Sequence, residues 1–321
     1  DLALEAFERI MGDMAARGMP RSLSLDIAEG APPAPVSAAD AELLQALLGF
    51  FDRFAALNRH DVREETATVY RRMGDIRGRL GHFDEAAEAY EEALTTYRQV
   101  ADDTDDSTGM LLAIAETLNA IGMAKSWGGS SREAIQSHEQ ALAALASSSF
   151  QQTTAPRLKL ARARTLNLLG SVALRASRGS MMGAMRTRRH GGGDPLGAPT
   201  GENGPGRRRR RQISVSAESL ADGNHEALSI LEGLCREDTT NAEYRHELAN
   251  CLRNRVVLAC RDGDVRKAQK AQLAAVAAFE GLVADFPEIP VYQCELARTL
   301  CMQLPGRRGA APIDSRWTAQ A

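Results

Sequence analysis

The sequence predicts an all-α protein, an α-solenoid of about four long helical hairpins with an N-terminal helical cap and a disordered basic insertion. Three observations predict it. Small residues recur in columns 48 positions apart, and apolar residues between them recur three and four apart. Residues 175–211 carry a net charge of +8 in a chain whose total is −3. A fixed period of this length indicates a stacked repeat array.

Two pairs of columns define the repeat. The N-terminal columns are Gly74, Gly122 and Gly170, and seven residues earlier Ala67, Ala115 and Ala163. The same spacing returns later as Glu247-Leu248-Ala249 and Glu295-Leu296-Ala297. Ala163 and Ala249 are 86 residues apart, which is one period plus 38 residues. The insertion therefore interrupts the third repeat.

Each unit is predicted to be two helices, as the first one illustrates. Asp61 and Glu64 make a helix start signal, and Gly81 suits the residue after a helix end. A second helix begins near Asp84 and carries apolar residues at helical spacing. Gly74 and Ala86 lack bulk, so the two helices can cross closely.

The N-terminal segment is predicted to cap the array. Residues 1–19 have an amphipathic helical pattern, and the prolines of GAPPAPV at 30–36 break it. Ser37 with Asp40 restarts a helix that runs to about Leu57, where it can cover the open end of the first repeat.

We therefore divide the chain into five parts. They are a cap at 1–60, repeats at 61–178, a Gly/Arg-rich insertion at 179–212, repeats at 213–304 and an irregular tail at 305–321. Because residue 1 is Asp, we expect a fragment or processed chain. The sequence assigns no compartment; the chain is expected to be cytoplasmic, or attached to a membrane through a missing N-terminal part.

The columns resemble the tetratricopeptide repeat (TPR), which places small or aromatic residues at positions eight, twenty, twenty-four and twenty-seven. The first unit has Gly74, Ala86, Tyr90 and Ala93; the second has Gly122, Ala134, His138 and Ala141; the fourth has Val256, Ala268, Gln272 and Ala275. The family's aromatic at position eleven is replaced by Arg77 and Lys125. The common period is about 34 residues, so 48 residues predict unusually long hairpins.

The resemblance implies that the first helix of each hairpin lines a groove for a peptide or protein partner. Carried over by position, the candidate groove residues are Arg71, Asp75, Asn119, Met123, Arg164, Asn167 and Arg253. Arginine and asparagine there can hold carboxylates and main-chain amides. The alternative is that these residues are only solvated helix faces. The predicted function is a scaffold or sensor for protein–protein interaction.

A second resemblance concerns the run LLQALLGFFDRFAALN, which precedes the first repeat. Together with that repeat it resembles the region after the kinase domain in large bacterial serine/threonine protein kinases with TPR tails. The chain itself contains no GxxxxGK[ST], no GxSxG and no kinase catalytic loop. We expect it to be a non-catalytic tail, not an enzyme, without a cofactor.

The alternative function rests on the basic insertion. Its arginine run, Arg207, Arg208, Arg209, Arg210 and Arg211, could hold phosphates of nucleic acid or anionic lipid. No aromatic residue interleaves the run, so a solvated linker is the competing interpretation. HELAN at 246–250 lacks the second histidine of a zinc motif, and the five cysteines lack metal-ligand spacing, so we expect no metal site. We expect the cysteines to be buried apolar residues.

Overall fold

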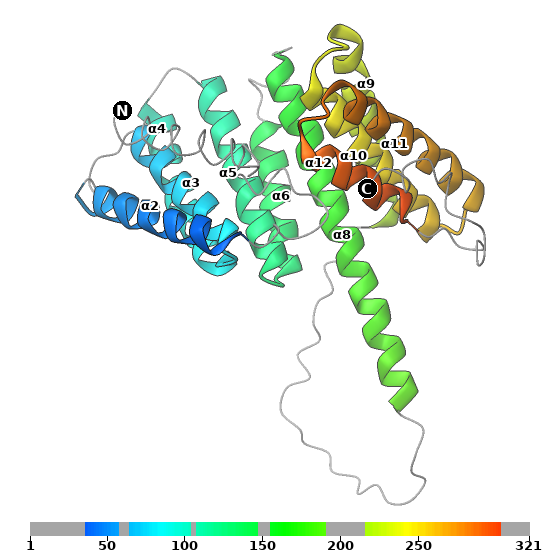
Figure 1. Cartoon of the computed structure of the whole chain (residues 1–321), viewed down its shortest axis with the longest axis horizontal. Helices are drawn as coiled ribbons and strands as arrows, with labels where there is room; N and C mark the ends of the chain where they lie inside the picture. The colour runs from blue at the N-terminus through cyan, green and yellow to red at the C-terminus, as the bar shows by residue number, and fades with distance from the viewer. Residues whose placement is uncertain (1–35, 58–63, 104–106, 147–154, 191–215, 303–321) are drawn as a thin grey trace, which may run out of the picture.

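The chain folds as an all-α solenoid, as the sequence predicts. The computed structural model describes residues 36–57, 64–103, 107–146, 155–190 and 216–302, and these ranges contain helices and turns but no strand. The helices follow one another from α2 at one end to α11 at the other (Figure 1).

Four hairpins and one further helix make the array. The hairpins are α3 (Glu64–Arg79) with α4 (Phe83–Asp103), α5 (Ser107–Trp127) with α6 (Ser131–Leu145), α8 (Pro156–His190) with α9 (Ala217–Glu237), and α10 (Ala242–Arg261) with α11 (Val265–Asp285). Helix α12 (Pro290–Leu300) follows. Each second helix packs on the first helix of the next unit, and the largest buried cluster reaches from α3 through the second hairpin to α8.

Three of the hairpin turns are built in the same way. Gly81, Gly129 and Gly263 have φ values of +82°, +90° and +75°, the left-handed region that glycine adopts at no steric cost. Gly81 and Gly129 are 48 residues apart, and Gly263 occupies the same place in the fourth hairpin. In the third hairpin this turn is where the insertion enters.

The glycine column lets the helices of a hairpin approach closely. A Cβ atom on Gly74 would lie 2.5 Å from Cε1 of Tyr90, and one on Gly122 would lie 2.6 Å from Cε1 of His138. Both rings are fully buried. The predicted close crossing is therefore confirmed, and the small residue makes room for a ring from the partner helix.

Helix α2 (Ala38–Leu57) is the predicted cap. Ser37 Oγ accepts a hydrogen bond from the Asp40 N–H at 3.2 Å, which fixes the helix start. Leu44 and Phe51 of α2 are fully buried in one cluster with Ile76 of α3. The cap therefore covers the apolar side of the first hairpin.

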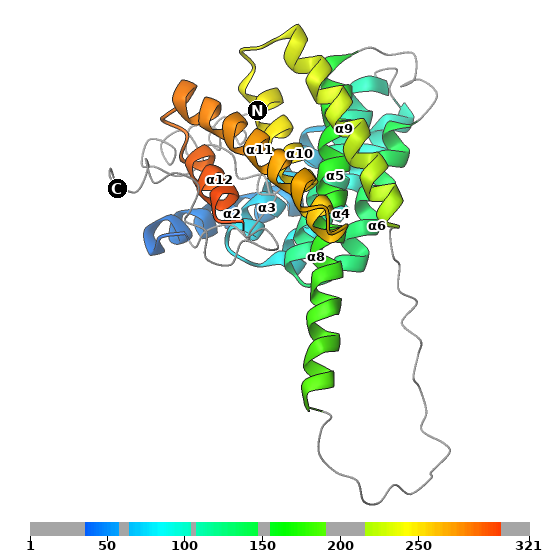
Figure 2. The same cartoon turned by 90° about the vertical axis from the view of Figure 1, so that its right-hand side faces the viewer.

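The insertion was predicted to be disordered from residue 179, but its first part is helical. Helix α8 continues through 179–190 to His190, and its last turns extend beyond the neighbouring helices in both views (Figures 1 and 2). Residues 191–212 lie outside the described residues. The second helix of the interrupted repeat is α9, in which Leu220, Asn224 and Ala227 precede Ala268, Gln272 and Ala275 by 48 positions.

Candidate partner-binding surfaces

Four of the candidate groove residues, which occupy the fifth position of their repeat units, join the first helices of successive hairpins. Each of these side chains donates a hydrogen bond to the first helix of the next hairpin or, from the last hairpin, to α12. We call these bonds together the polar ladder. Its members are Arg71 to Glu116 (2.9 Å), Asn119 to Thr165 (2.8 Å), Asn167 to the Glu247 carbonyl (3.2 Å), and Arg253 to Glu295. The acceptors differ, but at each of these junctions a donor from the same repeat position ties one hairpin to its neighbour.

The ladder corrects the predicted groove. Asn119, Asn167 and Arg253 are only 1%, 1% and 6% exposed. Asp75, which accepts a hydrogen bond from Tyr90 Oη at 2.8 Å, is 1% exposed, and Met123 is fully buried. A contact with a partner needs accessible atoms, so these five residues do not offer a binding surface in this structure.

The other two candidate residues keep some exposure but are already engaged. Arg164 donates from Nε to Glu247 at 2.7 Å and from Nη2 to Glu243 at 2.8 Å. The Arg71 side chain is 18% exposed and that of Arg164 is 12%. Both arginines serve the junction between hairpins.

Two buried histidines have roles that the sequence analysis did not identify. His138 Nδ1 lies 3.0 Å from Oδ1 of Asn119, and burial lowers the pKa of His138 to about 3, with Arg175 adding to the shift. His246 packs against the rings of Tyr292 and Phe279, with centroids 5.3 and 6.2 Å away. Burial likewise lowers the pKa of His246 to about 4. Both are therefore neutral core residues near pH 7.

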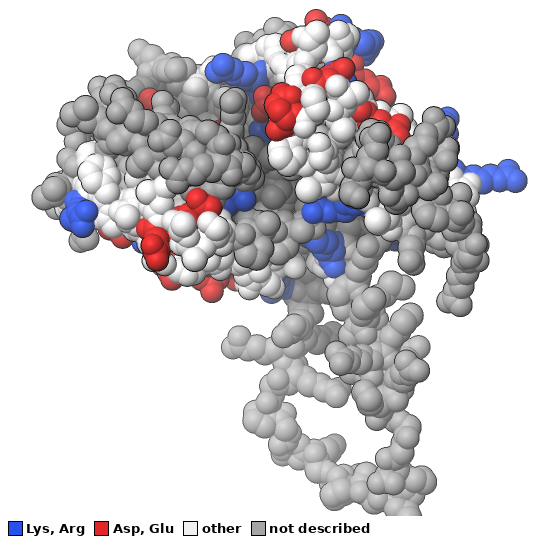
Figure 3. Space-filling model, in the orientation of Figure 1, with Lys and Arg blue, Asp and Glu red and all other residues white. Residues whose placement is uncertain are grey.

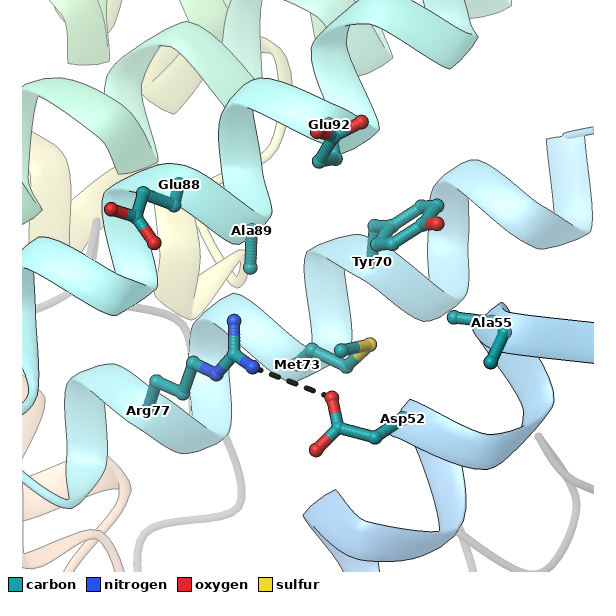
Figure 4. Close-up of a pocket in the computed structure, with 9 residues that line it drawn as sticks. Asp52, Ala55, Tyr70, Met73, Arg77, Glu88, Ala89 and Glu92 are labelled. Atoms are coloured by element: carbon teal, nitrogen blue, oxygen red, sulfur yellow. Dashed lines mark hydrogen bonds and ion pairs between the residues drawn. The ribbon is translucent and has the colours of Figure 1, made fainter. Parts of the chain in front are cut away.

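A cleft of about 520 Å³ opens between α2, α3 and α4 (Figure 4). We call it the cap cleft. Its lining is apolar at the base and acidic at the rim. The lining residues are Asp52, Ala55, Ala56, Tyr70, Met73, Arg77, Glu88, Ala89 and Glu92.

Two kinds of charge lie in the cap cleft. Arg77, which replaces the aromatic residue of the TPR pattern, lies 3.3 Å from Asp52 and 3.9 Å from Glu85. Glu88 and Glu92 are exposed on α4 and form no ion pair with any described residue. They are four residues apart on one helix, where like charges repel.

Arg207 to Arg211 lie outside the described residues. Acidic and basic side chains are interspersed on the face that Figure 3 shows. Within the described ranges, no three His, Cys, Asp or Glu side chains gather as metal ligands, and no helix combines the length and apolarity of a membrane span.

The cysteines differ from the expectation of burial. Cys251 is buried, Cys235 and Cys260 are half-buried, and Cys294 and Cys301 are exposed at the C-terminal end of the array.

Comparison with known proteins finds likenesses among solved structures only. No family model and no curated protein sequence matches the chain. Among solved structures, BtubC (BKLC) from P. vanneervenii is similar with a TM-score of 0.46 and 15% sequence identity. The match covers 88% of this chain and 100% of that one.

Proposed function

We propose that the chain is a protein–protein interaction module, a TPR-like scaffold or sensor region that binds a peptide or protein partner. The cap cleft supports this function: it is concave, about 520 Å³, and is lined by both apolar and charged side chains. The polar ladder supports it further, because a surface fixed before binding costs less ordering entropy.

The proposal extends to the chain's context as the non-catalytic tail of a bacterial serine/threonine protein kinase. The support is the run LLQALLGFFDRFAALN, which forms most of α2 directly ahead of the first hairpin. In this proposal α2 joins the repeats to whatever precedes them. The chain alone is then expected to show neither ATP hydrolysis nor phosphotransfer.

The test of the proposed function is a binary complex. Proteins cross-linked to the immobilised chain are identified, expressed and titrated against it by calorimetry near physiological salt. We expect at least one purified partner to bind with a fixed stoichiometry. The proposal fails if no captured candidate binds as a purified protein, or if the chain itself transfers phosphate.

Polyanion binding through Arg207–Arg211 is the second candidate, favoured by the +8 charge of residues 175–211. If all five arginines contact phosphates of single-stranded DNA, counterion release predicts a loss of about a hundredfold in affinity between 50 and 200 mM salt. Fluorescence anisotropy with labelled oligothymidine measures it. Replacing the five arginines by glutamine should remove this binding, whereas a protein partner titrated in parallel should be retained.

A further inference from the structure

The cap cleft has a structural counterpart one repeat later. A second cleft of about 270 Å³ lies between α4, α5 and α6. Its residues on α5 and α6 are those of the cap cleft moved by 48 positions. Tyr70, Met73, Arg77, Glu88, Ala89 and Glu92 correspond to Leu118, Ile121, Lys125, Gln136, Ser137 and Gln140.

The basic residue of each cleft shows that α2 takes the place of a preceding second helix. Lys125 lies 3.1 Å from Glu91 of α4 and 3.3 Å from Glu133 of α6. Arg77 lies in the same way between Asp52 of α2 and Glu85 of α4. Asp52 thus corresponds to Glu91, and three residues later Ala55 corresponds to Leu94.

Two differences make the cap cleft a better binding site. Ala55 is smaller than Leu94, which agrees with the larger volume of about 520 Å³ against about 270 Å³. Glu88 and Glu92 are carboxylates where the second cleft has the neutral amides Gln136 and Gln140. The first cleft therefore combines free volume with two carboxylates that have no ion-pair partner among the described residues.

We propose that the cap cleft binds an arginine or lysine side chain from a basic segment of a partner protein. This inference rests on the proposed function and names the chemistry of the partner. The lining residues carry three carboxylates, Asp52, Glu88 and Glu92, against the single cation of Arg77, so the cleft complements a positive charge.

The shape of the cleft suits a long basic side chain. Its alkyl stem can lie against the half-buried Tyr70 ring and the exposed Ala56. Its charged head reaches Glu88 and Glu92 at the rim. A bound cation also relieves the repulsion between these two carboxylates, and an arginine gains a bidentate carboxylate contact.

The test uses a fluorescein-labelled octapeptide with two central arginines flanked by leucines and glycines. Anisotropy is measured with the full chain and with the variant Glu88→Gln/Glu92→Gln. This variant has the same two neutral amides as the second cleft, where Gln136 and Gln140 stand. Losing two partly exposed ion pairs is expected to raise Kd about five- to tenfold. The matched control is Glu139→Gln/Glu280→Gln, two exposed glutamates on α6 and α11, which should leave Kd within about twofold.

A steric variant tests the same site without removing a carboxylate. Ala56 is exposed and lines the cleft, so Ala56→Lys should place a competing cation in it and raise Kd about tenfold. Ala46→Lys, at an exposed position of α2 outside the lining, adds the same charge as its control. Circular dichroism checks that all variants keep the helical fold.

Four outcomes overturn the inference. The first three are that the unchanged chain does not bind the peptide, that the cleft and control variants lose affinity equally, or that a peptide with glutamates in place of arginines binds equally well. The fourth is that the peptide binds more tightly when residues 191–215 are replaced by a Gly/Ser linker. The last would show that the chain's own arginine run occupies the cleft. If a partner confirmed by calorimetry binds Glu88→Gln/Glu92→Gln with unchanged affinity, the cap cleft is not its binding site. The proposed function would still stand.

Discussion

Replacing Arg253 by methionine is expected to lower the free energy of unfolding by about 3–5 kcal/mol. Arg253 forms a buried ion pair with Glu295, and the two side chains are 8% and 6% exposed. Methionine keeps an apolar side chain at this position but loses the guanidinium that lies over the Phe279 ring. Most of the loss comes from leaving the Glu295 carboxylate buried with Arg298, at 2.8 Å, as its remaining ion-pair partner among the described residues. Urea unfolding followed by circular dichroism measures it.

Two further variants show whether the stranded charge is the cause. Arg253→Met/Glu295→Leu removes both charges and should recover most of the loss, because an apolar pair of similar volume replaces a buried ion pair at little cost. Lys267→Met breaks an exposed pair with Asp264 and should cost no more than about 1 kcal/mol. If Arg253→Met and Arg253→Met/Glu295→Leu were equally stable, this would contradict a buried ion pair between Arg253 of α10 and Glu295 of α12.

Lowering the pH from 6.5 toward 4 is expected to destabilise the fold through His138 and His246. Burial lowers the pKa values of these histidines to about 3 and about 4, against 6.5 unfolded, so in this window the unfolded chain binds more protons. Their contribution is fully present above pH 6.5 and is lost as the pH falls toward the folded pKa. Each histidine is expected to remove up to about 1.4 kcal/mol per pH unit.

The pH prediction is checked by urea titrations between pH 7 and pH 4.5. His138→Gln should reduce the slope by up to half, because glutamine does not titrate and stands at the equivalent place in α11 as Gln272. His225→Gln, at an exposed position of α9, is the control for replacing a histidine by glutamine. A stability that is flat across this range would show that the histidines are not buried as described.

The sequence predicted the hairpins well because local patterns determine them. Turn glycines such as Gly81, the start at Ser37 and the small residues opposite rings all follow from the chain's own spacing. The continuation of α8 to His190 was missed because glycines at 179 and 183 and the run of arginines resemble a linker in composition.

The site was predicted less well, for a geometric reason. Helical periodicity shows which side chains share a face, but not which neighbouring helix covers that face. Asn119 bonds to Thr165, 46 residues away, and Arg253 bonds to Glu295, 42 residues away. The repeated Glu-Leu-Ala triplets could have indicated this, since Glu247 and Glu295 are both ladder members. The cap cleft, however, depends on where α2 docks, which no repeat spacing specifies.

One measurement tests most directly whether the 48-residue units pack as hairpins with a shared interior. It is the free energy of unfolding in urea of three variants, Gly74→Ala, Gly122→Ala and Gly170→Ala. Alanine at 74 or 122 is driven into a buried ring, so each should lose about 1–3 kcal/mol. Gly170 has no atom within 4 Å of the added Cβ, so alanine there should gain up to about 1 kcal/mol from helix propensity alone. Stabilisation by alanine at all three glycines, or an equal loss at all three, would contradict the close crossing of the first two hairpins.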